Sequence, residues 1–151
     1  MLSKLIIKAP AKLNLHLQVL DERNDGYHNI SSYFTFINFF DELEFFLTED
    51  EILLRESPTI NNNLVIQAAE LIKNESKTSL GVEIKLLKNI PQQKGLGGGS
   101  SDAAATLIAL NKIWNLNYSK QELQDMGLRL GSDVPFFIHG HSCWSEGRGE
   151  I

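Results

Sequence analysis

The sequence predicts an α+β domain with two layers, in which one sheet packs against a few helices. Three observations lead to this prediction: apolar and polar residues alternate in several segments, apolar residues recur at helical spacing in others, and a glycine-rich run separates a strand-like segment from an alanine-rich one. At 151 residues and 42% hydrophobic content, the chain is long enough for one domain with a core and short for two. We therefore expect a single unit across residues 1–151.

The N-terminal third is expected to be mostly sheet. Residues 13–19 read Leu-Asn-Leu-His-Leu-Gln-Val, an alternation of apolar and polar residues that marks a half-buried strand. We expect the apolar side chains of this segment to face a core: Leu13, Leu15, Leu17 and Val19. Aromatic, β-branched or alternating residues predict further strands at 33–37, 43–47, 82–86 and 142–145.

Apolar residues at helical spacing predict three helices. The first covers residues 64–72, with Asn62 or Asn63 as its N-cap. The second follows the glycine-rich run and ends near Asn115, and its apolar residues share one face. The third begins at Ser119, which has the capping-box spacing to a glutamate three residues later, and ends before the glycine at 131.

The charge balance restricts the partners of this chain. Lys and Arg number 14 against 19 Asp and Glu, so the net charge of −5 gives no general attraction to nucleic acid or to an anionic membrane surface. An RNA-binding module is disfavoured for the same reason. One cysteine, no long apolar signal region and no apolar run near the ~20 residues of a membrane helix predict a cytoplasmic protein.

The clearest functional element is the glycine-rich run. Residues 95–101 read Gly-Leu-Gly-Gly-Gly-Ser-Ser, in which backbone amides can approach a ligand without side-chain hindrance. The free N–H groups and the dipole of the following helix then point at the occupant, which suits the oxygens of a triphosphate. The residues expected to bind phosphate are Pro91, Gln92, Gln93, Lys94, Gly95, Leu96, Gly97, Gly98, Gly99, Ser100 and Ser101.

A flexible glycine-serine linker is the alternative interpretation of this run. The apolar face of the helix that opens directly after it argues against a linker. The run is not a Walker loop, because no Gly-Lys-Ser/Thr follows the required gap, and it lacks the third glycine of a dinucleotide fingerprint. Asp102, the next residue, either favours the positive helix end or holds Mg²⁺ beside the phosphates.

Four segments together resemble one kinase family. Residues 10–15 (Pro-Ala-Lys-Leu-Asn-Leu), 25–28 (Asp-Gly-Tyr-His), 95–104 and 131–137 (Gly-Ser-Asp-Val-Pro-Phe-Phe) appear in the order found in the 4-diphosphocytidyl-2-C-methyl-D-erythritol kinases of the GHMP superfamily. The resemblance implies the N-terminal fold of that superfamily, which is ribosomal-protein-like. It also implies ATP and Mg²⁺ as cofactors and phosphorylation of the 2-hydroxyl of an intermediate of the non-mevalonate isoprenoid pathway.

The resemblance implies two catalytic residues. Asp133 matches the aspartate that takes the proton from the substrate hydroxyl, and Lys12 matches its lysine partner. A carboxylate and an ammonium suit those roles. Without the resemblance, the residues are as consistent with a helix N-cap at Asp133 as with a catalytic role, and they predict that Lys12 is an exposed strand residue.

Further positions match the family's binding residues. Three match the part of the site that holds the cytidine end of the substrate: Asn14, Tyr27 and His28. An aromatic ring and an imidazole suit a pyrimidine, although hairpin residues of these types need no ligand. Asn63 matches a position near the adenine and is equally a helix N-cap. No metal-ligating residue is assigned, because His139 and His141 have no nearby cysteine and make a poor metal site.

The sequence departs from the family in two respects. The positions of Gln93 and Lys94 are usually small in the family, and here Lys94 either supplies a cation for the triphosphate or distorts the loop. Family members also continue beyond the position of Ile151 into a second domain, which we expect to be absent. Two hypotheses follow: an ATP-dependent kinase acting on that 2-hydroxyl, or a non-catalytic remnant with at most residual nucleotide binding. For the 151-residue chain by itself we expect no turnover above background.

Overall fold

The computed structural model describes residues 3–22, 28–57 and 63–145, and it has the predicted α+β architecture. The strands in these ranges are β1 (Lys4–Glu22), β2 (His28–Thr48), β3 (Ile52–Ser57), β4 (Gly81–Leu87) and β5 (Cys143–Ser145). The helices are α1 (Leu64–Ser76), α2 (Gly98–Ile113), α3 (Lys120–Leu130) and α4 (Val134–His139). Every segment predicted as strand or helix therefore has the predicted type.

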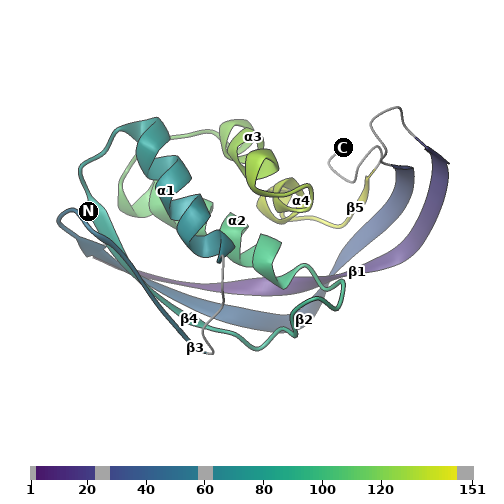
Figure 1. Cartoon of the computed structure of the whole chain (residues 1–151), viewed down its shortest axis with the longest axis horizontal. Coiled ribbons are helices and arrows are strands. Elements are labelled where there is room, and N and C mark those ends of the chain that lie inside the picture. The colour runs from purple at the N-terminus through teal and green to yellow at the C-terminus, as the bar shows by residue number, and fades with distance from the viewer. Residues whose placement is uncertain (1–2, 23–27, 58–62, 146–151) are drawn as a thin grey trace.

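The strands form one sheet in the order β1-β2-β4-β3, and β5 pairs with β2. β1 with β2 and β2 with β4 are antiparallel pairs, whereas β3 and β4 run parallel. All four helices of the described ranges lie on the same face of the sheet, which leaves the opposite face open (Figure 1). The molecule thus has two layers.

The core lies between the sheet and the helices. Alternate residues of each strand point to the helix side, and on this side Leu43, Phe45 and Ile84 are fully buried. The alanine-rich helix α2 packs against α1, α4 and β1. The indole Nε1 of Trp114, at the end of α2, donates a hydrogen bond of 3.1 Å to the carbonyl of Gly81. These contacts fix α2, and with it the glycine-rich run that precedes it.

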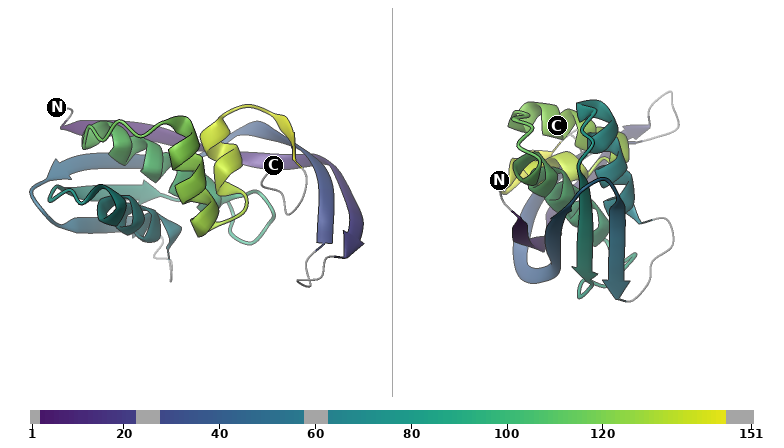
Figure 2. Two further views of the ribbon diagram at one scale, coloured as in Figure 1. Left: turned by 90° about the horizontal axis from the view of Figure 1, so that it is seen from above. Right: turned by 90° about the vertical axis from the view of Figure 1, so that its left-hand side faces the viewer.

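The predicted burial of residues 13–19 is wrong. This segment is part of β1, as expected, but β1 and β2 continue beyond the helices as a long curved hairpin (Figures 1 and 2). None of the helices in the described ranges covers this part of the sheet, so these helices provide no core for the alternating apolar side chains. Their exposed fractions are 39% for Leu13, 65% for Leu15, 57% for Leu17 and 58% for Val19.

The helix ends follow the predicted capping. The side chain of Asn63 accepts a hydrogen bond of 2.8 Å from the amide of Val65 and caps α1. Ser119 and Glu122 form the capping box of α3. Gly131 follows α3 with extended backbone at φ 176°, so it ends the helix without the left-handed turn that favours glycine. Within the described ranges, no helix combines the length and the apolar content that crossing a membrane requires.

Candidate active site

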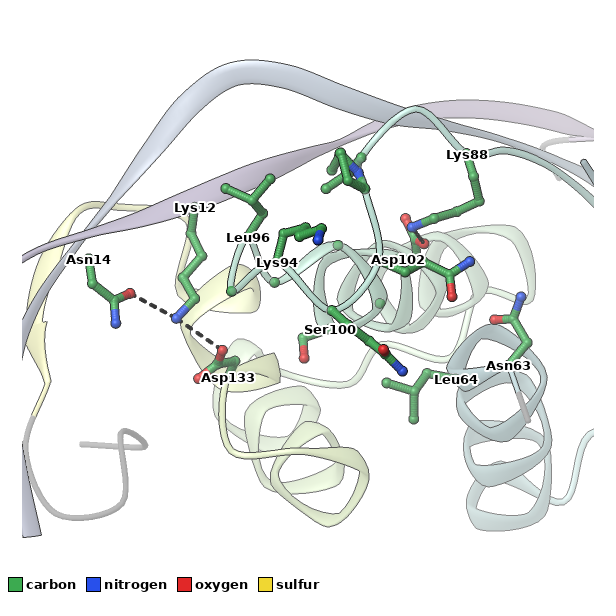
Figure 3. Close-up of a pocket in the computed structure, with 18 residues that line it drawn as sticks. Lys12, Asn14, Asn63, Leu64, Lys88, Lys94, Leu96, Ser100, Asp102 and Asp133 are labelled. Atoms are coloured by element: carbon green, nitrogen blue, oxygen red, sulfur yellow. Dashed lines mark hydrogen bonds and ion pairs between the residues drawn. The ribbon is translucent and has the colours of Figure 1, made fainter. Parts of the chain in front are cut away.

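The glycine-rich run borders a cavity of about 480 Å³ (Figure 3). Residues 91–100 form one wall, and Lys12 and Asn14 of β1, Asn63 before α1 and Asp133 before α4 contribute from other elements. All the predicted site residues whose side chains the structure describes therefore line this cavity, except Ser101. The remaining lining residues are Leu64, Lys88, Ile90 and Asp102.

Two glycines of the loop adopt the left-handed backbone region, Gly95 at φ 71° and Gly97 at φ 69°. A Cβ atom at Gly97 would also lie 2.7 Å from the ring of Phe137 and 3.0 Å from Cγ of Lys12. Gly97 is thus required by its backbone conformation and by close packing. Gln93, one of the two long side chains that depart from the resemblance, has φ 56°, a region that side chains rarely adopt.

Helix α2 begins in the wall of the cavity. Its first residues are Gly98 and Gly99, and the amide of Ser101 donates to the carbonyl of Gly97 at 2.9 Å as the first bond of the helix. The amides of Gly98, Gly99 and Ser100 consequently have no partner inside the helix. This is the arrangement of backbone donors that suits phosphate oxygens.

Ser101, one of the residues expected to bind phosphate, does not line this cavity. Ser101 is 2% exposed and lines a separate cavity of about 110 Å³ between β1, α2 and α4. Successive residues in a helix differ by about 100° in direction, so Ser100 and Ser101 face different sides of α2. Only Ser100 lines the larger cavity.

Lys12 and Asp133 meet beside the loop. The Lys12 Nζ atom lies 3.1 Å from Asp133 Oδ2 and donates a hydrogen bond of 2.9 Å to Asn14 Oδ1 (Figure 3). It also lies 4.1 Å from the ring centroid of Phe34, which is a favourable cation–π position. Lys12 is 5% exposed, so its interpretation as an exposed strand residue is wrong. A buried ammonium requires such partners, because desolvation of an unpaired charge is costly.

Asp133 occupies the N-cap position of α4 without acting as its cap. Its side chain makes no capping hydrogen bond, and its backbone has φ −85° and ψ −16°. The side chain is 29% exposed and forms the ion pair with Lys12. The carboxylate is therefore available from the cavity.

The other predicted binding residues divide between described and undescribed parts of the chain. Asn63 lines the cavity and also caps α1, so the two interpretations of this residue are compatible. Tyr27 lies outside the described residues, and of His28 only the backbone, at the start of β2, is described. The cytidine-binding role of both stays a prediction.

Sequence reasoning missed a buried charge network beneath the loop. Lys88 forms ion pairs with both Asp41 and Asp102, the latter at 2.8 Å. The three side chains are between 0% and 5% exposed. No local pattern signals these pairs, because Asp41 and Lys88 are 47 positions apart in the sequence. Asp102 thus forms a buried ion pair, which the sequence did not predict.

The network shifts the pKa values of two of its members. Burial raises the pKa of Asp102 to about 7, although the ion pair with Lys88 opposes this shift. Burial alone would lower the pKa of Lys88, but the carboxylates of Asp102 and Asp41 outweigh it and raise that pKa above its ordinary value. The ammonium therefore stays protonated, whereas Asp102 titrates near neutral pH.

A comparison with known protein families identifies the family that has this domain. Residues 63–141, about half of the chain, match the model of the GHMP kinases N-terminal domain. The chain belongs to the GHMP kinase family. Its N-terminal strands precede the matched segment and contribute Lys12 and Asn14 to the same cavity.

Its curated relatives include 4-diphosphocytidyl-2-C-methyl-D-erythritol kinases. The chain is 50% identical over 147 residues to the enzyme of Albidiferax ferrireducens and 48% identical over 150 residues to that of Nitrosomonas europaea. These matches cover 95% and 96% of this chain, but 51% and 54% of the relatives. The chain thus spans about half the length of the curated relatives it matches, and it is a homologue of that half.

Solved structures agree with this assignment. A crystal structure of a 4-(cytidine 5'-diphospho)-2C-methyl-D-erythritol kinase superposes with a TM-score of 0.88 at 37% identity, covering 97% of this chain and 53% of that one. The mevalonate kinase of Methanococcus jannaschii superposes with a TM-score of 0.72 at 18% identity, covering 99% of this chain and 55% of that one. The second likeness shows the shared fold alone.

Proposed function

We propose that the cavity binds ATP with Mg²⁺ and that its residues serve phosphoryl transfer to the 2-hydroxyl of 4-diphosphocytidyl-2-C-methyl-D-erythritol. The observation that carries this proposal is the placement of the Lys12–Asp133 pair in the same cavity as the amides that open α2. A base and a phosphate-binding loop that face the same cavity are what in-line transfer to an alcohol requires. The identity of the alcohol comes from the curated relatives.

In the proposed reaction, Asp133 accepts the proton of the substrate hydroxyl. The hydroxyl oxygen forms a bond to the γ-phosphorus as the bond from that phosphorus to the bridging oxygen breaks, and ADP leaves. Lys12 holds the Asp133 carboxylate in place through their 3.1 Å ion pair and offsets the negative charge that develops nearby. The amides at the start of α2 hold the phosphate oxygens.

Magnesium would enter this site on the nucleotide. The ion prefers oxygen ligands and keeps several waters, so phosphate oxygens supply much of its coordination. Within the described residues, no group of three or more acidic, histidine or cysteine side chains is placed to hold a metal. Two lining residues have side-chain oxygens that could coordinate such an ion, Ser100 through its hydroxyl and Asp102 through its carboxylate. Among the described residues, Asp102 Oδ1 is buried and has no hydrogen-bond partner. These residues fit a nucleotide-bound ion, which would neutralise phosphate charge.

The proposal treats residues 1–151 as an N-terminal ATP-binding domain with a cytoplasmic location. A second candidate function is nucleotide binding without turnover. The loop, Lys12 and Asp133 all lie in the half shared with the relatives. Binding requires the amides at the start of α2, whereas transfer also requires a bound and aligned alcohol.

Calorimetry with Mg²⁺-ATP tests the proposed binding, with Gly98→Val as the disabling variant. A Cβ at Gly98 would lie 3.0 Å from Cγ2 of Ile90, and a valine adds branched bulk where phosphate must approach. We expect binding to the unmodified chain and none to Gly98→Val. Equal binding to both proteins would refute the loop assignment. A turnover assay with the diphosphocytidyl substrate then separates the two candidate functions.

A further inference from the structure

The buried network of Asp41, Lys88 and Asp102 has no role in the proposed transfer step. Burying charged groups costs several kcal/mol per ion, and well-packed apolar residues are often as stabilising as a buried ion pair. Stability therefore does not account for the presence of three charged side chains here. Their position beneath the phosphate loop suggests what they do instead.

Asp41 fixes the first end of the loop. Its Oδ1 atom accepts hydrogen bonds from the amides of Asn89 at 2.6 Å and Ile90 at 2.8 Å. These two residues follow β4 and lead into the loop. The Asn89 side chain adds a bond of 2.9 Å to the carbonyl of Phe40, next to Asp41 in β2. Asp41 is completely buried and does not line the cavity, so it acts on a ligand only indirectly, through the loop and through Lys88.

Lys88 joins that end of the loop to the start of α2. A Cβ atom at Gly98 would lie 3.1 Å from Lys88 Nζ, so the ammonium lies directly against the first residue of the helix. The same ammonium pairs with Asp102, one turn further along α2. Both ends of loop 91–97 are consequently tied to one buried network, through Asp41 on one side and Asp102 on the other.

We infer that Asp41, Lys88 and Asp102 are positioning residues that hold the loop at the spacing in which the first amides of α2 receive the phosphate groups of a nucleotide. This inference rests on the proposed function, since it presumes that the loop binds Mg²⁺-ATP. Asp41 provides the cleanest test, because it touches two loop amides and the network but not the cavity.

Two variants of Asp41 test the positioning role, with a matched control on the same strand. Asp41→Ala removes the acceptor, and Asp41→Asn restores an acceptor without charge. The control Glu44→Gln makes the same change at a partly exposed carboxylate that pairs with Lys4 and lies outside the network. We expect amide exchange at Asn89 and Ile90 to accelerate by about tenfold or more in Asp41→Ala and less in Asp41→Asn, since a buried bond to a charged acceptor is lost. The dissociation constant for Mg²⁺-ATP should rise in the same order, by about tenfold in Asp41→Ala, with Glu44→Gln unchanged.

The outcomes separate this inference from the proposed function. If the unmodified chain binds no Mg²⁺-ATP, the proposed function fails. If Asp41→Asn and Asp41→Ala keep unmodified affinity or unmodified exchange at Asn89 and Ile90, the positioning role fails while the function stands. Should Asp41→Ala not fold, Asp41→Asn carries the test.

Discussion

The amide of Lys12 donates a hydrogen bond of 2.9 Å to the carbonyl of Leu96. One residue of β1 therefore holds the phosphate loop through its backbone and the proposed base, Asp133, through its ammonium. The loop carbonyl lies immediately before Gly97, whose Cα packs against the Lys12 side chain. Displacement of the loop should consequently disturb the Lys12–Asp133 pair as well as phosphate binding.

Gly97→Ala tests this coupling. The added methyl would meet Phe137 at 2.7 Å and Lys12 at 3.0 Å, and the backbone is left-handed. We expect a loss of about 2–4 kcal/mol in the free energy of unfolding by urea, from overpacking and backbone strain together. Gly95→Ala is the control, because φ is also positive there but nothing lies within 4 Å of the added atom. It should cost only the strain, about 1–2 kcal/mol. Equal losses in both variants would contradict the packing role of Gly97.

Asp133→Asn tests the proposed base. Placed in a chain extended to the length of the relatives, this variant keeps the shape of the side chain and removes its ability to accept the proton. Turnover should fall by about 10²–10⁴-fold, with ATP binding nearly unchanged. A purely structural role through the ion pair with Lys12 predicts a change in stability and a near-normal rate. Steady-state kinetics distinguishes the two roles, and a rate above about a tenth of the parent rate favours the structural one.

The pKa of Asp102 predicts a pH-dependent stability. It rises from an ordinary 3.8 to about 7 on folding, so between these values the folded chain holds more protons than the unfolded chain. The free energy of unfolding contributed by this group is then fully present below about pH 4 and falls as the pH rises through 7. Melting temperatures measured from pH 5 to pH 8 should fall more steeply in the unmodified chain than in Asp102→Asn, by several degrees. Parallel pH profiles would show that Asp102 ionises normally.

The exposed leucines of β1 predict tolerance to polar substitution. Leu17 is 57% exposed beyond the helices, whereas Leu43 of the neighbouring strand is fully buried. Leu17→Ser should change the free energy of unfolding by less than about 0.5 kcal/mol. Leu43→Ala should cost about 2–5 kcal/mol through the cavity it leaves. Denaturant unfolding of both variants compares them, and a large loss in Leu17→Ser would mean that a core does cover this hairpin.

The sequence by itself determined the type of the elements it predicted and the location of the glycine-rich loop, but it did not predict β3 or α4. These features depend on residues that are only a few positions apart, so they can be predicted from the sequence: strand alternation, helical spacing, the Asn63 cap and the capping box at Ser119. The same holds for the glycines at the start of α2, whose conformational freedom is local.

Only the tertiary structure decided which side chains are buried and which charges meet. Leu15 alternates like a buried residue but lies on a hairpin that none of the described helices covers. Lys12 is expected to be exposed but is buried against the glycine-rich loop and beside Asp133. Asp41 and Lys88 pair across 47 positions because β2 and β4 are neighbours in the sheet. Burial and ion pairing depend on contacts between distant segments, and such contacts exist only once the sheet and the helices have packed together.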